Sequence, residues 1–348
     1  MKAVLKTKDG KAGWEYKDVP RPEPKMDEVE IEVKAIGICG SEIHLYHDNH
    51  FYTPPVIVGH EFSGIVSRIG SNVTDYKVGD RVVAQMDKGA CGKCEFCRKG
   101  MTNFCVRGKA VGYDIDGGWA EYYCTPEKYL LKLPENISYE VGTMAEPSNV
   151  VCQALYVRNT LKPGDVVFVQ GGGTIGMLCA IYAKAMGASK IILSETNEGE
   201  IARLPIARKL KSVDRTVNIE KENLNQVIME ETDFRGADLI IECSGSEKGI
   251  AAMFDCLKKT GRVVVLGETA AKSVSLDWNN ILVKKSCDIT FSFGEIYEAW
   301  DIALRLMSLP QVEEDLNRMI SHRLPLADFG KGFDLLEKKE GLKVILEP

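Results

Sequence analysis

The chain has 348 residues, 45% of them hydrophobic and 27% charged, a balance that excludes intrinsic disorder and low-complexity architectures. At about 100 to 200 residues per domain, this length indicates two domains. The 44 basic and 50 acidic residues give a formal net charge of −6, spread without long runs, so the chain lacks the charge pattern of a nucleic-acid or membrane-surface binder and we expect a small-molecule partner.

The start of the chain carries no apolar core of signal-peptide length. The most apolar stretch, residues 166–183, is interrupted by Gln170 and by four glycines, which a membrane span does not need. We therefore expect a cytoplasmic protein without membrane contact. In that reducing compartment the eleven cysteines are expected to be metal ligands, catalytic groups or core residues rather than disulfides.

Up to about residue 147 the sequence alternates short strand-like runs with turns, which predicts a mainly β domain. The runs cover residues 30–34, 62–69, 81–84 and 119–124. Trp119 follows Gly117 and Gly118, and we expect its side chain to lie in the core.

Three residues near these runs form a candidate metal site. Cys39 follows the first run, and His60 and Glu61 directly precede the second. Thiolate, imidazole and carboxylate together are a ligand set for zinc that leaves one position open for water or substrate. Taken singly, each has another explanation: a small core cysteine, a hydrogen-bonded core histidine and a surface acid. Their occurrence with the dinucleotide motif described below favours a catalytic zinc.

The segment after Cys39 is rich in rings, with Tyr46, His47, His50, Phe51 and Tyr52 close together. Such a segment either lines a substrate pocket or packs against the core or another subunit. The sequence does not decide between these two interpretations.

Four cysteines lie close together in the segment of about residues 89–107. Cys91, Cys94, Cys97 and Cys105 have the spacing C-x2-C-x2-C-x7-C, which lets one loop surround a tetrahedral ion. Four thiolates close the coordination sphere, so a structural zinc is predicted. An iron–sulfur cluster fits less well, since the ferredoxin run has three residues before its last cysteine and a proline after it. A disulfide or free-thiol loop remains the other alternative.

From about residue 150, apolar strands alternate with amphipathic helices, which predicts a doubly wound parallel sheet covered on both faces. The predicted strands are 165–170, 190–194, 237–243 and 262–267, and the predicted helices are 171–187 and 248–259. After about residue 288 this alternation ends; a helix at 297–307 and a strand at 344–346 are expected to fold back onto the first domain. The fold class is therefore α/β, with residues 1–148 and 288–348 in one domain and 149–287 in the other.

The first strand of the second domain leads into a G-x-G-x-x-G motif made by Gly171, Gly173 and Gly176. The three glycines allow a tight turn, a close approach to a pyrophosphate, and close packing of helix on strand. A helix that starts near Thr174, with Ile175 in its first turn, directs free N–H groups toward the anion. The remaining alternative is a glycine-rich turn without a ligand.

Glu195 lies nineteen residues after Gly176, at the end of the next predicted strand. An acid at this place hydrogen-bonds the adenosine ribose hydroxyls and repels a 2′-phosphate, which favours NAD over NADP. A basic segment follows it, and Pro205 falls where a helix is expected to start. The cations of this segment are Arg203, Arg208, Lys209, Lys211 and Arg215. Either they form a solvated helix face, or one of them binds a 2′-phosphate.

Taken together, these motifs resemble the zinc-containing medium-chain alcohol dehydrogenase superfamily, especially the polyol branch around sorbitol and threonine dehydrogenases. The run Gly59-His-Glu-x2-Gly64-x5-Gly70-x2-Val73 matches the zinc signature of that family at every fixed position. The likeness spans the whole chain and includes Met144-Ala-Glu-Pro147 and Gly341-Leu-Lys-Val344. It implies a GroES-like catalytic domain built from both chain ends, an inserted Rossmann domain, and a homodimer or homotetramer.

The resemblance also implies residue roles. Cys39, His60 and Glu61 are similar to the catalytic zinc ligands, and Glu146 to the acid that lies near or on that metal. Ser41 is similar to the hydroxyl residue that receives the alcohol proton, and His44 to the histidine that carries this proton toward solvent. Two zinc ions per chain are implied, one catalytic and one structural. Whether Glu61 or Glu146 binds the catalytic ion stays open.

The function implied is NAD-dependent oxidation of a secondary alcohol, namely a polyol, cyclitol or sugar alcohol, free or phosphorylated, to a ketone. L-Threonine 3-dehydrogenase is the nearest enzymatic alternative. The chain departs from sorbitol dehydrogenase at Ser292, where that enzyme has a substrate-binding arginine, so sorbitol itself is in doubt. A non-catalytic NAD-binding or crystallin-like protein is the alternative from another class, and the presence of all the ligand residues argues against it. A zinc-free quinone reductase is disfavoured by the same residues.

Overall fold

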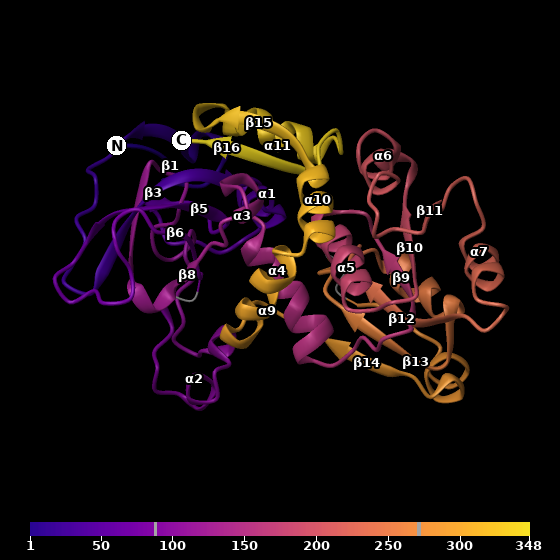
Figure 1. Ribbon diagram of the computed structural model, residues 1–348. Coiled ribbons are helices and arrows are strands. Elements are labelled where there is room, and N and C mark those ends of the chain that lie inside the picture. Colours follow the sequence, from indigo (N-terminus) through magenta and orange to yellow (C-terminus); the bar gives the residue numbers. More distant parts are fainter. Residues whose placement is uncertain (87–88, 270–272) are drawn as a thin grey trace.

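The computed structural model describes residues 1–86, 89–269 and 273–348, which form two halves, each built around a β-sheet (Figure 1). The first half of the molecule contains the strands within residues 2–132 and 320–347, and the second half contains the strands within residues 166–291. This is the predicted α/β class, with a mainly β domain joined to a doubly wound one.

The first half contains a seven-stranded, mainly antiparallel sheet in the order β15-β16-β3-β5-β6-β8, with β7 paired to β3. The C-terminal strand β16 pairs antiparallel with β3, where Ile345 lies opposite Gly37. A small sheet, β2-β1-β4, lies beside it. The strands are β1 (Lys2–Lys6), β2 (Trp14–Asp18), β3 (Glu28–Gly37), β4 (Val56–Ile57), β5 (Phe62–Ile69), β6 (Arg81–Ala84), β7 (Tyr122–Pro126), β8 (Leu130–Lys132), β15 (Ile320–Pro325) and β16 (Lys343–Glu347).

The second half contains a six-stranded sheet in the order β11-β10-β9-β12-β13-β14, and every neighbouring pair in it is parallel. The order reverses at β9, which creates a crevice at the carboxyl ends of β9 and β12 where ligands of such folds bind. The strands are β9 (Val166–Gln170), β10 (Lys190–Glu195), β11 (Arg215–Asn218), β12 (Ala237–Glu242), β13 (Leu257–Val265) and β14 (Asp288–Phe291).

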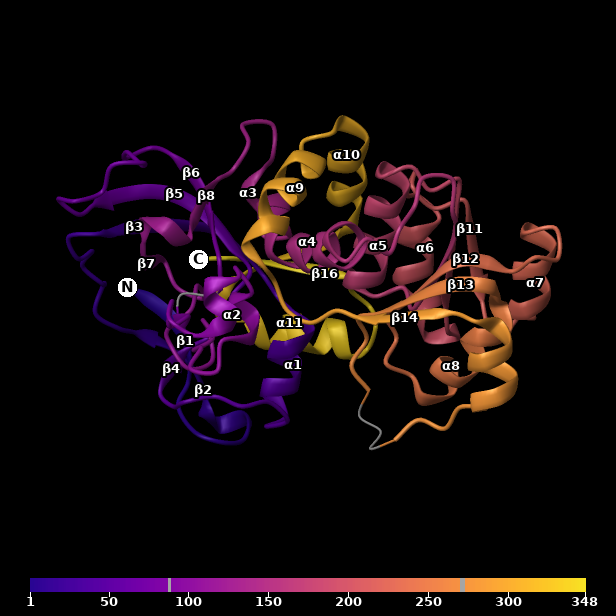
Figure 2. The same cartoon turned by 90° about the horizontal axis from the view of Figure 1, so that it is seen from below.

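Helices cover the six-stranded sheet and join the two halves. In both views α4, α5, α9 and α10 lie between the sheets (Figures 1 and 2). The helices are α1 (Gly40–Tyr46), α2 (Glu95–Arg98), α3 (Tyr139–Gly142), α4 (Ala145–Cys152), α5 (Thr174–Ala185), α6 (Arg203–Ala207), α7 (Leu224–Glu231), α8 (Glu247–Ala252), α9 (Tyr297–Met307), α10 (Pro310–Met319) and α11 (Phe329–Glu337). No helix within 1–86, 89–269 or 273–348 is both long enough and apolar enough to span a bilayer.

The core follows the apolar pattern of the sequence. Val167, Phe168 and Val169 of the central strand β9 are fully buried, as expected for a strand covered on both faces. Trp119 is also fully buried, which confirms its predicted place in the core, where it stacks on Phe333 of α11 with ring centroids 5.8 Å apart.

Three element predictions are wrong in their bounds, and one of them is the strand 262–267, which begins at Leu257 as β13. The predicted helix 248–259 ends at Ala252, because Leu257 already pairs with Ala237 as the first residue of β13. The predicted strand 119–124 begins only at Tyr122, where pairing with β3 starts, because Ala120 forms an isolated bridge with Ala3 of β1 instead. β14, Asp288–Phe291, pairs with β13 and is therefore part of the six-stranded sheet.

A buried carboxylate holds two strands of the first half together. Glu30 of β3 accepts hydrogen bonds from Arg21 Nη2 at 2.6 Å, Arg68 Nε at 2.8 Å and Ser67 Oγ at 2.6 Å. Burial alone would raise the pKa of Glu30, but Arg68, Arg21 and Ser67 together lower it to about 2. The ionised Glu30 therefore stabilises the folded state at neutral pH.

We expect Glu30→Gln to lower the free energy of unfolding at pH 7 by about 2 to 3 kcal/mol. Because the pKa of Glu30 is lowered on folding, this stabilisation is complete above the unfolded value of about 4.5 and is lost as the pH falls toward 2. Urea unfolding at pH 7, 5, 4 and 3 measures it. Glu32→Gln is the control, since Glu32 lies on the same strand with 40% of its side chain exposed. A difference between wild type and Glu30→Gln that stays constant with pH would contradict the assignment.

Candidate active site

The N-terminus of α1 places Cys39 and Ser41 next to each other. Cys39 is the N-cap residue of α1, and its backbone N–H donates to Glu42 Oε2 at 2.8 Å. Burial raises the pKa of the Cys39 thiol, so a metal ion would have to displace its proton on binding. Ser41 lies in the first turn of α1, and His44 is exposed one turn further on.

His60 and Glu61 end the turn that leads into β5. Gly59 has φ of +92°, and a Cβ on it would lie 1.8 Å from Trp119 Cδ1, so only glycine fits before His60. His60 Nδ1 pairs with Glu42 Oε1 at 2.7 Å. Burial would lower the pKa of His60, but the Glu42 carboxylate raises it. Glu42 thereby holds the ring and leaves Nε2 available to a metal ion.

Two buried carboxylates face the histidine. Glu61 forms an ion pair with the fully buried Lys343 of β16, which also donates to Ile38 O at 3.4 Å. Glu146 comes from the first turn of α4, and burial raises its pKa to about 7. The C-terminal strand therefore supplies a cation to a site whose other groups come from the first half of the sequence.

The structure places the four predicted ligand residues, together with Glu42, in two overlapping groups that share His60. Ligand atoms of Cys39, Glu42 and His60 lie within 4.8 Å of one another, and so do those of His60, Glu61 and Glu146. One thiol, one imidazole and carboxylate oxygens are a donor set that suits zinc. The residues present therefore fit a zinc ion, while the predicted ligand roles remain predictions.

A cavity of about 410 Å³ opens beside this group. His60, Ser41 and Tyr113 line one part of it, and Thr102, Asn103 and Cys105 of the four-cysteine segment line another, together with Lys109 just after that segment. The Tyr113 hydroxyl donates to Ser41 Oγ at 2.6 Å. The cavity thus joins the candidate metal site to polar side chains that an alcohol substrate could contact.

In the ring-rich segment after Cys39, some side chains line the cavity and others pack against the rest of the chain, so each of the two interpretations holds for part of the segment. His50 and Phe51 line the cavity. Tyr46 packs on Phe333 with ring centroids 4.7 Å apart, while His47 pairs with Glu337 of α11. The Tyr52 hydroxyl donates to Asp9, outside the cavity.

The glycine loop has the geometry that a pyrophosphate requires. Gly173 is the N-cap residue of α5, and a Cβ built on it would meet nothing within 4 Å, so open space lies in front of the backbone there. A Cβ on Gly176 would lie 1.9 Å from Gly171 O, which explains the third glycine. Thr174 begins the helix as predicted, and its Oγ1 donates to Leu342 O at 3.2 Å. These residues fit a dinucleotide.

Glu195 ends β10 as predicted, but its own chain holds the carboxylate. Its oxygens accept hydrogen bonds from Gly172 N at 3.1 Å, Thr196 N at 2.8 Å and Arg203 Nη1 at 3.2 Å. Burial would raise the pKa of Glu195, but Thr196 and Arg203 lower it overall. Binding ribose through Glu195 would therefore require some of these contacts to exchange for ribose hydroxyls.

Most cations of the basic segment after Glu195 form ion pairs with acids other than Glu195. Arg208 pairs with Glu200, Lys211 with Glu314 and Arg215 with Glu222. Pro205 lies inside α6, within its first turn, where its missing N–H costs no helical hydrogen bond.

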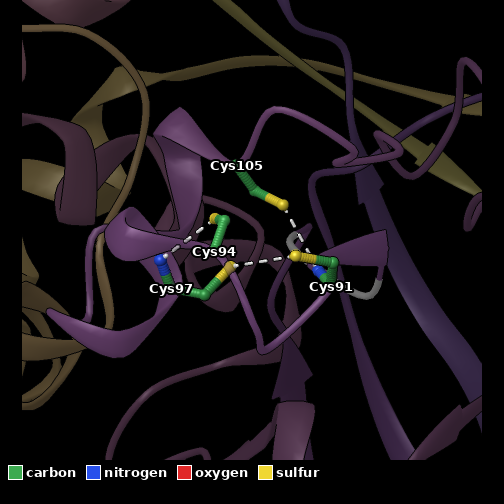
Figure 3. Close-up of side chains that lie close together, drawn as sticks. All are labelled: Cys91, Cys94, Cys97 and Cys105. Atoms are coloured by element: carbon green, nitrogen blue, oxygen red, sulfur yellow. Dashed lines mark hydrogen bonds between the residues drawn. The ribbon is translucent and has the colours of Figure 1, made fainter.

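The four cysteines of residues 89–107 point toward one another (Figure 3). Their sulfurs lie within 4.8 Å of each other, and all four are free thiols. Cys91 N donates to Cys105 Sγ at 3.3 Å, and Cys97 N donates to Cys94 Sγ at 3.5 Å (Figure 3). Backbone N–H groups of Lys93 and Cys94 lower the pKa of the Cys91 thiol to about 6. This cluster fits a zinc ion held by four thiolates.

Sequence reasoning missed three residues of the candidate site: Glu42, Tyr113 and Lys343. Glu42 had a signal, since its place three residues after Cys39 is typical of a capping box. Tyr113 and Lys343 had none, because their contacts with Ser41 and Glu61 span 72 and 282 residues of sequence.

Comparisons with known proteins match nearly the whole chain. Residues 25–135 match the alcohol dehydrogenase GroES-like domain, and residues 174–308 match the zinc-binding dehydrogenase domain. A sorbitol dehydrogenase of Halalkalibacterium halodurans is 31% identical, with 100% of this chain and 99% of that protein covered. An L-threonine 3-dehydrogenase of Klebsiella pneumoniae is 35% identical, with 99% of each chain covered.

Among solved structures, a zinc-binding dehydrogenase from Sinorhizobium meliloti, crystallised with NADP, is 29% identical and superposes with a TM-score of 0.86. The comparison covers 100% of this chain and 99% of that one. The similarity therefore extends over both halves of the molecule.

Proposed function

The chain belongs to the zinc-dependent medium-chain alcohol dehydrogenase family, and we propose that it oxidises a secondary alcohol group of a polyol, cyclitol or sugar alcohol, free or phosphorylated, to a ketone with NAD. The observation that carries this proposal is that the donor atoms of Cys39, Glu61 and Glu146 lie close to His60, which lines the same cavity as Ser41. The domain proposed to carry catalysis comprises residues 1–148 and the C-terminal segment after β14. Residues 149 to the end of β14 form the proposed coenzyme domain.

We assign two zinc ions to each chain. Cys39 and His60, with a carboxylate from Glu61 or Glu146, would hold the catalytic ion, and Cys91, Cys94, Cys97 and Cys105 the structural one. At the catalytic position zinc supplies Lewis-acid chemistry, which lowers the pKa of a bound hydroxyl from about 16 toward about 7.

The residues of the chain prepare the substrate for hydride transfer. Ser41 Oγ accepts the proton of the alcohol, and the exposed His44 one turn later is placed to pass a proton toward solvent. Glu42 holds the His60 ring by its Nδ1. The backbone of Gly171, Gly173, Thr174, Ile175 and Gly176 binds the pyrophosphate of NAD, the hydride acceptor, and Glu195 is the proposed ribose ligand.

The substrate is tested by following NADH formation with a panel of alcohols. We expect turnover with at least one of sorbitol, threitol, the inositols and their phosphates, and no comparable kcat/KM with ethanol. Turnover of L-threonine alone would assign the chain to the second candidate, which the 35% identical relative favours. Absence of NADH formation with every compound, in protein that contains two zinc ions per chain, would contradict the proposed substrate class.

We propose that two copies of the chain associate along β14. This strand is an edge of the six-stranded sheet, and exposed edges bind other strands readily. Phe291 of β14 is 70% exposed, and in the helix that precedes this strand in sequence Trp278 is 70% and Val283 56% exposed. Light scattering is expected to give a dimer or tetramer mass, and Phe291→Lys is expected to lower it. A monomeric wild-type protein would contradict this proposal.

A further inference from the structure

Tyr113 is a buried side chain of the cavity that the proposed chemistry does not yet use. Its residue is 2% exposed, and its backbone is fixed because Thr53 N donates to Tyr113 O at 2.9 Å. His50 stacks on its ring, with centroids 4.4 Å apart and an interplanar angle of 29°, and the His60 ring lies 5.6 Å away. The ring therefore has one orientation, and its hydroxyl has one main partner.

That partner is Ser41. The Tyr113 hydroxyl donates to Ser41 Oγ at 2.6 Å, whereas His60 Nδ1, at 3.5 Å, is already paired with Glu42 at 2.7 Å. A phenol is a stronger hydrogen-bond donor than an aliphatic alcohol, so the Tyr113 hydroxyl is the donor of this pair and Ser41 Oγ is the acceptor. The direction of the hydrogen bond is thus fixed.

A fixed donor determines what Ser41 can do. A serine hydroxyl has two acceptor sites and one proton to donate. Tyr113 takes one acceptor site, which leaves the second to receive the proton of the substrate and directs the proton of Ser41 to another acceptor. Without Tyr113 the Ser41 hydroxyl would rotate among three staggered positions, and only a fraction of molecules would present a lone pair to the substrate.

We propose that Tyr113 is a positioning residue for the oxidation reaction: its hydroxyl orients Ser41 Oγ so that Ser41 accepts the proton of the alcohol. This inference rests on the proposed function, since it assumes that Ser41 is the proton acceptor. It assigns to Tyr113 a role that acts through Ser41 and not through direct contact with zinc or coenzyme.

The test is a double-mutant cycle of Tyr113→Phe and Ser41→Ala, measured as the single-turnover rate of NADH formation at saturating NAD and alcohol, so that product release does not mask the chemical step. We expect Tyr113→Phe alone to lower this rate by about tenfold or more, as loss of proton-transfer geometry does. In the Ser41→Ala background it is expected to change the rate less than about twofold. The KM for alcohol is expected to change little.

Tyr182→Phe is the matched control. The Tyr182 hydroxyl also is buried and also donates to a serine, Ser148 Oγ at 2.7 Å, but it lies on α5 outside the cavity. We expect this variant to lose stability and to keep the wild-type single-turnover rate. Thermal unfolding of both variants separates loss of stability from loss of rate.

A crystal structure of Tyr113→Phe gives a readout that does not depend on activity. We expect Ser41 Oγ in more than one rotamer in this variant and in a single rotamer in the wild type. The inference is overturned if Tyr113→Phe keeps the wild-type rate, or if it lowers the rate equally in both Ser41 backgrounds. A wild-type protein that oxidises none of the alcohols would instead contradict the proposed function, and in that case the Ser41 rotamers alone decide whether Tyr113 orients Ser41.

Discussion

Replacing Cys39 by serine is expected to abolish alcohol oxidation, with kcat/KM lower by at least about three orders of magnitude. The serine hydroxyl is close to the thiol in size but is a much weaker zinc ligand, since it does not ionise near neutral pH. With only His60 and the carboxylates left, the zinc content is expected to fall from about two per chain to about one. Metal analysis of the purified variant, together with NADH formation, measures both effects.

The coenzyme site is expected to survive this change, because Cys39 lies on α1 while the glycine loop lies between β9 and α5. NADH binding, followed by fluorescence, is therefore expected to stay within about twofold of wild type. Cys287→Ser is the control, since Cys287 is another partly buried free cysteine outside both clusters. Retained turnover in Cys39→Ser, or a zinc content still near two, would remove Cys39 from the metal site.

The sequence predicted most of the fold because apolar periodicity and glycine spacing are local signals. β9, α5 and β10 lie where the pattern 165–170, 171–187 and 190–194 placed them, to within two or three residues at their ends. The predicted helix 248–259 failed in its second half because Met253–Cys256 form a 3-10 helix and Leu257 begins β13 opposite Ala237 of β12. Pairing between strands twenty residues apart is decided by tertiary contacts rather than by local periodicity.

The candidate site shows the same limit. Cys39, His60 and Glu61 were predicted from their residue types, from the dinucleotide motif in the same chain and from the resemblance to the zinc signature. Lys343 and Tyr113 reach the site only because β16 pairs with β3 and because the backbone of Tyr113 is held by Thr53. A lysine or tyrosine in an ordinary strand or turn has no sequence signal that distinguishes it from a surface residue.

The ring-rich segment, residues 46–52, shows how side chains that are close in sequence can have different environments. Tyr46 and Phe51 are both aromatic and close in sequence, yet the first packs on Phe333 and the second lines the cavity. Their environments differ because α1 ends at Tyr46 and the chain then turns, with Asp48 at φ of +57°. Side-chain direction after such a turn depends on backbone geometry that composition does not encode.

Replacing Cys94 by alanine is expected to remove the second zinc and to destabilise residues 89–107, while the catalytic ion remains. Cys94 is the N-cap residue of the four-residue helix α2, and its Sγ accepts from Cys97 N. Such a segment has almost no apolar core, so the ion itself is expected to hold it folded; structural zinc contributes about 10 to 16 kcal/mol in small zinc domains. We expect about one zinc per chain and a lower unfolding temperature.

Loss of structure in this segment is expected to affect activity, because the segment lines the cavity proposed to bind the substrate. Thr102, Asn103 and Lys109 line the cavity, and Asn103 Nδ2 donates to Phe293 O at 2.7 Å. Disorder of the segment is therefore expected to raise the KM for alcohol more than it lowers kcat, because the residues that hold Ser41 and His60 are untouched. NADH binding should be unchanged, since the glycine loop lies in the other half of the molecule.

Glu95→Gln is the control for Cys94→Ala, because it changes the same helix without removing a thiolate. Glu95 is the first residue of α2, and 70% of its side chain is exposed in a 4.0 Å contact with Lys99, so its loss is expected to change stability by less than about 1 kcal/mol. Metal analysis and thermal unfolding of the two variants, side by side, then decide the assignment. A Cys94→Ala protein that keeps two zinc ions and the wild-type unfolding temperature would show that these four thiols do not hold a structural ion, and iron without zinc in the wild type would favour the iron–sulfur alternative.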